Sequence, residues 1–184
     1  LMKIILGSAN LGNHYGILKK KLKSPEFNLA LRYLLKKKNN YLETSLEYKS
    51  LQNLKKFNDL NKFKITLKIN FKDKEYKKKV DDFIKCHKIK KLYCIMLHDP
   101  DNLIKMNNTY KNLSSFKKNR ICEYIGVSLY DLNKFDKIFK KYNFDIIQAP
   151  LNLFDQRFLD KKKMSFIKKK KDYISGKINI FTRN

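Results

Sequence analysis

Short apolar runs alternate along the chain with longer, lysine-rich segments in which apolar residues recur every three or four positions. The short runs are too brief for independent helices and several are rich in isoleucine, so they predict β-strands. The longer segments, such as 28–38, 74–87 and 131–142, place apolar residues on one helical face and lysines on the other. The predicted strands cover residues 3–6, 41–44, 64–69, 91–97, 124–129, 145–151 and 177–181.

Strict alternation of predicted strands and helices implies parallel strands joined by right-handed crossovers. An open doubly wound sheet and a closed barrel both satisfy this pattern. A complete TIM (β/α)8 barrel needs eight strands and roughly 250 residues, whereas this sequence of 184 residues supplies seven predicted strands. We therefore expect residues 1–184 to form a single α/β domain, an incomplete barrel that stops about one strand and two helices before closure.

Polar residues at the ends of the predicted strands indicate where helices begin. Asp131 follows a predicted strand and Ser50 precedes an apolar helical segment, so each side chain can cap the next helix. Pro100, between Asp99 and Asp101, predicts another corner between a strand and a helix.

The chain carries 43 basic and 17 acidic residues, a formal net charge of +26. An excess of this size can indicate a nucleic acid or an anionic membrane as partner. However, 39 of the basic residues are lysines spread along the whole chain, whereas proteins that read bases and phosphates favour arginine for its bidentate fork. This distribution favours solvated helix faces, and a nucleic-acid-binding protein stays the less favoured alternative.

The cysteines and the apolar runs bear on the compartment. Cys86, Cys94 and Cys122 form no CxxC pair and no spacing typical of metal ligands, which favours a reducing cytoplasm. The adjacent Cys86 and His87 are a weak metal signal, and a helix surface explains them better. The apolar run 4–6 is too short for a signal peptide, and no run has the length of a membrane-spanning helix.

Functional side chains of parallel α/β folds gather where the strands reach their carboxyl ends. At these ends the sequence offers Glu43 and Tyr48 after the second predicted strand, Lys68 in the third and His98 after the fourth. Each signal is weak alone, but a lysine inside an apolar run is unusual, because a buried ammonium is costly unless it is paired.

These four groups together suit one chemistry. A tyrosine has an ordinary pKa of about 10, and a nearby ammonium lowers that pKa because it stabilises the phenolate. A carboxylate would hold the lysine charged, and an imidazole would orient a carbonyl oxygen. The set then forms a general acid that faces a carbonyl group. A hydride donor is also needed, which no side chain supplies.

The ordered motifs at these positions resemble those of the aldo-keto reductases. Tyr48 lies five residues after Glu43, as in the family's acid-to-tyrosine step, and Lys68 and His98 match the lysine and histidine of the next two strands. Further similarity lies in residues 6–12, 15–17 and 125–128, and in residues 147–157, which resemble one bacterial branch.

The resemblance implies a TIM barrel that binds NADP(H) or NAD(H) and reduces an aldehyde or ketone by hydride transfer. Tyr48 would be the general acid, with a pKa lowered by Lys68, and His98 would orient the carbonyl. Ser128 and Gln148 would hold the carboxamide of the nicotinamide. Arg183 falls where many members stack an aromatic side chain on the nicotinamide, and the bacterial branch also uses arginine there. The similarity of 148–157 to proteins near surface-sugar genes suggests a small, sugar-derived carbonyl substrate.

The sequence also departs from the family pattern. Glu43 stands where the family has aspartate, and its longer arm could misplace Lys68; Lys49 replaces the glycine after the tyrosine. The loops after the seventh and eighth strands, which hold the cofactor's phosphates in the family, are not in this sequence, so we expect weak cofactor affinity. Open barrel edges also predict self-association. A catalytically inactive barrel fragment is therefore the main alternative to an active enzyme.

Overall fold

The computed structural model of the protein describes residues 5–11, 23–131, 133–150 and 157. It divides into two compact units, Leu1–Tyr93 and Cys94–Asn184, which we treat separately. The predicted strand at 177–181 lies outside the described residues, as does Arg183. No helix in the described part has the length and apolar character that crossing a bilayer requires.

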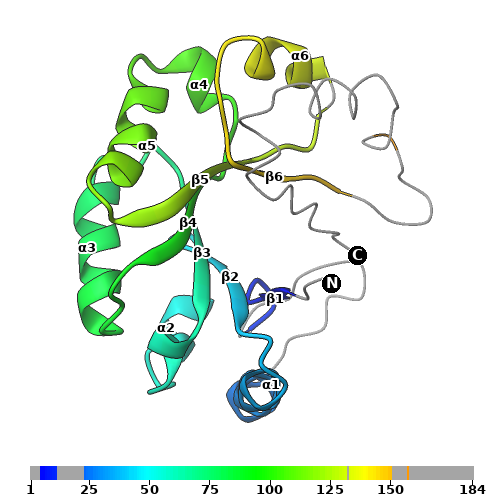
Figure 1. The fold of residues 1–184 in the computed structure, drawn as a ribbon, viewed down its shortest axis with the longest axis vertical. Helices are drawn as coiled ribbons and strands as arrows, with labels where there is room; N and C mark the ends of the chain where they lie inside the picture. The colour runs from blue at the N-terminus through cyan, green and yellow to red at the C-terminus, as the bar shows by residue number, and fades with distance from the viewer. Residues whose placement is uncertain (1–4, 12–22, 132, 151–156, 158–184) are drawn as a thin grey trace. The chain divides into compact units, whose positions relative to one another are not determined.

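The first unit contains three parallel strands and the helices that connect them (Figure 1). Strand β2 pairs with β1 on one side and with β3 on the other, each in parallel. The elements are β1 (Ile5–Gly7), α1 (Ser24–Lys36), β2 (Tyr41–Ser45), α2 (Ser50–Leu54), η1 (Leu60–Lys62), β3 (Lys64–Ile69) and α3 (Tyr76–Cys86).

Strand β4 (Leu92–Leu97) crosses the boundary between the units, and the second unit continues from it. Its last two strands form a parallel pair, and helix α5 packs against β5. The elements are α4 (Asn102–Lys105), α5 (Thr109–Lys118), β5 (Cys122–Ser128), α6 (Asn133–Phe139) and β6 (Ile146–Gln148).

The observed strands agree with six of the seven predicted ones, and β3 has the predicted bounds. Helix α1 begins four residues earlier than predicted, at Ser24 rather than at residue 28. Pro25 occupies its first turn, where the missing N–H costs nothing. The carboxylate of Glu26 accepts a hydrogen bond of 2.9 Å from the backbone N–H of Lys23, which satisfies one free donor of the helix start.

Strands β2 and β3 are buried on both faces, as is typical of parallel sheets covered by helices. Paired residues of parallel strands point the same way, and neighbours along a strand alternate. Leu42, Ile65 and Leu67 therefore form an apolar face, whereas Glu43 and Lys68 lie on the other face. A buried polar face on two adjacent strands needs internal partners.

Helices α1, α3 and α5 end in the same way, although no glycine is present there. The second residue after each helix adopts a left-handed conformation: Lys38 (φ 55°), Lys88 (φ 52°) and Arg120 (φ 60°). After α3, the N–H of Lys88 bonds to Lys85 O (3.2 Å) and the N–H of Ile89 to Ile84 O (3.0 Å), a Schellman motif. The pattern recurs after α1 and α5 and turns the chain sharply into the next strand.

Candidate active site

Glu43 and Lys68 form a buried ion pair on the polar face of β2 and β3. The Lys68 Nζ atom lies 2.8 Å from Glu43 Oε1, and the side chains are 0% and 11% exposed. The register pairs Glu43 with Thr66, so the ion pair runs diagonally to a residue two positions further along β3. Long side chains bridge such diagonal neighbours.

The sequence raised two questions about Lys68: what pairs with its buried ammonium, and whether the longer arm of Glu43 misplaces it. This ion pair answers both. A buried ammonium is stabilised only with a partner, and Glu43 is that partner. The longer arm of glutamate, where the family has aspartate, does not separate the two groups. The substitution therefore preserves the contact that the family pattern requires.

Tyr48 lies in a tight turn between β2 and α2. Its N–H donates to Ser45 O (3.0 Å), and the N–H of Leu46 donates to Lys68 O (3.0 Å), which joins the turn to β3. The Lys68 Nζ atom lies 5.1 Å from the centre of the Tyr48 ring. The structure thus brings an acid, an ammonium and a phenol together at the carboxyl ends of two adjacent strands.

Lys49 does not disturb this turn, although the family has glycine there. Its backbone has ordinary right-handed helical angles (φ −58°, ψ −21°), which every residue type adopts. Its side chain is exposed. The turn therefore has no need of a glycine at this position.

Three buried hydroxyl groups lie where β1, β2 and α2 meet. Ser8 Oγ donates to Thr44 Oγ1 (2.8 Å) and lies 3.1 Å from Ser50 Oγ. The prediction that Ser50 caps α2 is wrong: Ser50 is the first residue of the helix, and its hydroxyl bonds to Ser8 instead. The cluster ties the start of α2, and with it the turn of Tyr48, to the end of β1.

His98 follows β4 in the second unit and is half-buried. The next residues form the predicted corner: Asp99 Oδ1 accepts from the N–H of Asp101 (2.9 Å), and Asp99 O accepts from Asn102 Nδ2 (2.8 Å). The Asp101 carboxylate pairs with Lys134 of α6, and this hydrogen bond lowers the pKa of Asp101 below its usual value of 3.8. The corner that follows His98 is thus well fixed.

Asp131 behaves as the sequence predicts, since its carboxylate accepts a 2.9 Å hydrogen bond from the N–H of Asn133, the first residue of α6.

Ser128 and Gln148 are register partners at the carboxyl ends of β5 and β6. Both are buried, at 0% and 5% exposure. The Ser128 hydroxyl accepts or donates no hydrogen bond within the described part of the chain. A buried, unsatisfied hydroxyl beside a side-chain amide fits the donor and acceptor groups of a carboxamide, the group that ends a nicotinamide.

Gly126 allows β5 and β6 to lie this close. A Cβ atom at this position would lie 2.9 Å from Ile146 O and 3.0 Å from the Met96 methyl carbon. The glycine of the Gly-Val-Ser segment therefore has a packing reason.

The family model for aldo/keto reductases matches residues 3–173. The chain belongs to the aldo/keto reductase family. Solved structures of aldo-keto reductases have a similar fold. Aldo-keto reductases from Pseudomonas aeruginosa (14% identity) and from Bacillus halodurans, in its holo form (16%), give TM-scores of 0.69 and 0.70. They cover 92% and 98% of this chain.

A third aldo-keto reductase, from Klebsiella pneumoniae and solved with NADP and acetate, has 12% identity, a TM-score of 0.68 and covers 90% of this chain. This chain spans 69%, 61% and 60% of the three structures, in the order given. The likeness confirms the predicted α/β fold of TIM-barrel type in an incomplete form. A comparison with curated protein sequences gives no match.

Cys86 and His87, the weak metal signal of the sequence, lie at the end of α3. No group of three potential metal ligands occurs among the residues that the structure describes. Cys86 is exposed, as predicted, but His87 is buried and its ring packs 4.8 Å from that of Phe83. Burial, together with the positive charge of Lys55, lowers the pKa of His87 from its usual 6.5.

Proposed function

We propose that this chain reduces an aldehyde or ketone by hydride transfer from NADPH or NADH, with Tyr48 as the general acid. The observation that carries this proposal is the buried Glu43–Lys68 ion pair with the Lys68 ammonium 5.1 Å from the centre of the Tyr48 ring. A nearby ammonium stabilises a phenolate, the form that a tyrosine takes when it gives up its proton.

In this proposal each residue of the first unit has a distinct role. The Lys68 ammonium stabilises the phenolate that forms when Tyr48 protonates the carbonyl oxygen. Glu43 pairs with the Lys68 ammonium and orients it. The nicotinamide, when bound, supplies the hydride.

The cofactor part rests on the second unit. The unsatisfied Ser128 hydroxyl and the neighbouring Gln148 amide are the groups that we infer to hold the nicotinamide carboxamide. The Klebsiella pneumoniae structure, solved with NADP, supports a nicotinamide cofactor. His98, as the group that orients the carbonyl, and Arg183, near the nicotinamide, are proposed from their sequence motifs.

The substrate class and location are proposed more broadly. We infer a small carbonyl compound, with a sugar-derived one suggested by residues 148–157. The thiols of Cys86, Cys94 and Cys122 are all free, which suits a reducing cytoplasm. Self-association stays a prediction that analytical ultracentrifugation would test.

The first experiment follows the loss of NADPH fluorescence against a panel of aldehydes and ketones. We expect Tyr48→Phe to lower kcat by about 10²- to 10⁴-fold, since it removes a general acid. Tyr33→Phe is the matched control, because this tyrosine is 59% exposed on α1, and it should keep full activity. Equal activity of the wild type and Tyr48→Phe would refute the role of Tyr48.

A double variant, Glu43→Gln with Lys68→Met, separates chemistry from folding. It replaces the buried charges by neutral groups of similar size, so the fold should survive while reduction is lost. NADPH binding, measured by fluorescence, should stay close to that of the wild type. If the wild type binds NADPH and reduces no carbonyl of the panel, the alternative of an inactive barrel gains.

A further inference from the structure

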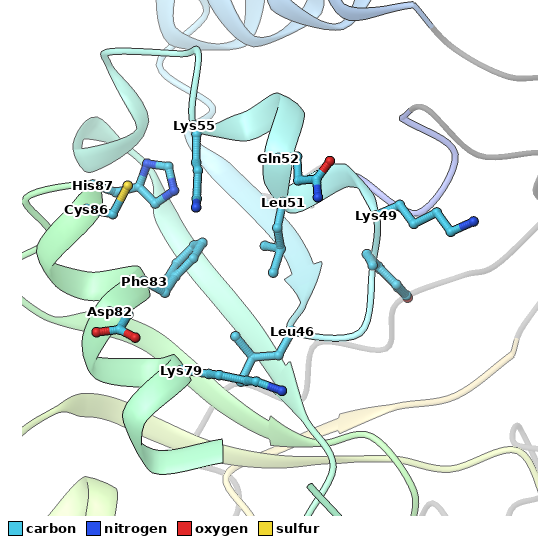
Figure 2. Close-up of a pocket in the computed structure, with 11 residues that line it drawn as sticks. Leu46, Lys49, Leu51, Gln52, Lys55, Lys79, Asp82, Phe83, Cys86 and His87 are labelled. Carbon is cyan, nitrogen blue, oxygen red and sulfur yellow. The ribbon is translucent and has the colours of Figure 1, made fainter. Parts of the chain in front are cut away.

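A cavity of about 560 Å³ lies between α2 and α3 of the first unit (Figure 2). Its volume is in the range of cavities that hold small organic molecules. Glu43 and Lys68 are not among the described residues that line it, so it is distinct from the ion pair. Tyr48 does line it, and the cavity therefore reaches the turn that carries the proposed general acid.

The two helices that flank the cavity differ in length. Helix α2 has 5 residues and α3 has 11, so at a rise of about 1.5 Å per residue α2 covers less than half the length of α3. Leu46, Leu51 and Phe83 supply an apolar wall beside this uncovered stretch (Figure 2). An apolar ligand body would remove that wall from water.

Lys55 gives the cavity its charge. Its side chain extends between His87 and Leu51 toward Phe83 (Figure 2). Within the described residues it takes part in no ion pair. Two further lysines line the cavity. Lys79 is held by Asp73 at 2.6 Å, and the side chain of Lys49 points away from Lys55 (Figure 2).

Two other lining groups adjust the field around Lys55. The lowered pKa of His87 keeps its imidazole neutral near pH 7. Asp82 is the acidic residue of the described lining, and it is in no ion pair with a described residue. The ammonium of Lys55 is therefore available to an anion, and the negative charge of Asp82 weakens the attraction between that anion and Lys55.

We propose that this cavity binds a small organic acid, with its apolar body against Leu51 and Phe83 and its anionic head on Lys55. The inference goes beyond carbonyl reduction and does not depend on it. Because Tyr48 lines the same cavity, an occupant would touch the turn of the proposed active site without touching the ion pair.

The probe for this site is 8-anilinonaphthalene-1-sulfonate, an aromatic anion whose fluorescence rises in apolar surroundings. We expect saturable binding to the full chain in the absence of NADPH. Lys55→Gln should weaken binding by about two- to fivefold, and Asp82→Asn should tighten it. Lys78→Gln is the matched control, because this exposed lysine of α3 does not line the cavity and its loss should leave binding unchanged.

A second measurement places the probe. The chain has no tryptophan, so Gln52→Trp introduces a single reporter at an exposed position that lines the cavity. Its emission should fall as the probe binds, with the same midpoint as the probe signal. Circular dichroism checks that each variant folds.

Two results would overturn the proposal. One is an equal loss of affinity in Lys55→Gln and Lys78→Gln, which would indicate general attraction to a basic protein. The other is equal affinity for the uncharged analogue N-phenyl-1-naphthylamine, which would indicate an apolar surface without an anion site. Since the titration needs no cofactor or carbonyl, it succeeds or fails independently of the reductase activity.

Discussion

The Glu43–Lys68 ion pair of the first unit and the Asp101–Lys134 ion pair of the second join the same kinds of group in different surroundings. The buried pair has side-chain exposures of 11% and 0%, and the surface pair 26% and 30%. A buried pair loses hydration that its mutual attraction barely replaces, whereas a surface pair loses little and gains little. The buried pair, with the larger desolvation free energy, lies beside the proposed general acid, and the surface pair fixes the corner of the chain after His98.

The largest effect should come from breaking the buried pair. Lys68→Met leaves the Glu43 carboxylate buried without its partner and should lower the free energy of unfolding by about 3–5 kcal/mol. Urea denaturation measures this. Adding Glu43→Gln to the same chain should restore most of the loss, and a double variant as unstable as the single one would contradict our account of the pair.

A left-handed residue after a helix is a feature that both units share, and its effect on stability can be tested at Lys88 and Arg120. Lys88→Gly and Arg120→Gly should each raise the free energy of unfolding by about 1 kcal/mol, because glycine carries no penalty in this conformation. Thermal melting gives the comparison. Asp81→Gly, at an exposed position in the middle of α3, is the control with the opposite sign, since glycine weakens a helix interior.

The surface pair should respond more weakly than the buried one. Lys134→Met should lower the free energy of unfolding by about 0.2–1 kcal/mol, and 1 M salt should remove most of this difference between the variant and the wild type. Lys134 lowers the pKa of Asp101. The stabilisation that this pair gives the folded protein is therefore present above pH 3.8, the usual pKa of the carboxyl group, and is lost as the pH falls below it. A cost of 3 kcal/mol would erase the contrast between the two pairs.

His87 should give the smallest effect. Its pKa is lowered in the folded protein, so the unfolded chain takes up a proton first as the pH falls. Stability should be constant above pH 6.5 and decline as the pH falls from 6.5 through the folded-state pKa of His87. His87→Gln should flatten this part of the curve of melting temperature against pH; an unchanged curve would assign the decline to other groups.

The strand positions were readable from the sequence because a parallel strand buried on both faces leaves a continuous apolar run. Residues 64–69 are such a run, and β3 has those bounds. Helix starts were harder. Local signals, Pro25 and Glu26, mark the true beginning of α1, whereas the role of Ser50 depends on Ser8, which is 42 residues away.

The same division holds for the candidate site. The motif spacing marked Glu43, Tyr48 and Lys68, but the contact between Glu43 and Lys68 needs the register of β2 against β3, which spacing does not contain. No signal in the sequence pointed to Lys55, the residue that we propose to hold an anion. Nothing distinguishes it among 39 lysines until α2 ends early and leaves it beside α3.

Helix α2, with 5 residues, is far below the length at which a helix persists in water. It exists because Ser50 is held by the Ser8 hydroxyl at one end and Leu54 is buried at the other. Its backbone hydrogens can therefore exchange with deuterium only when those two anchors loosen. The rate of hydrogen exchange at residues 51–54 would therefore report how often the contact between Ser8 and Ser50 opens and frees the turn of Tyr48 from the end of β1.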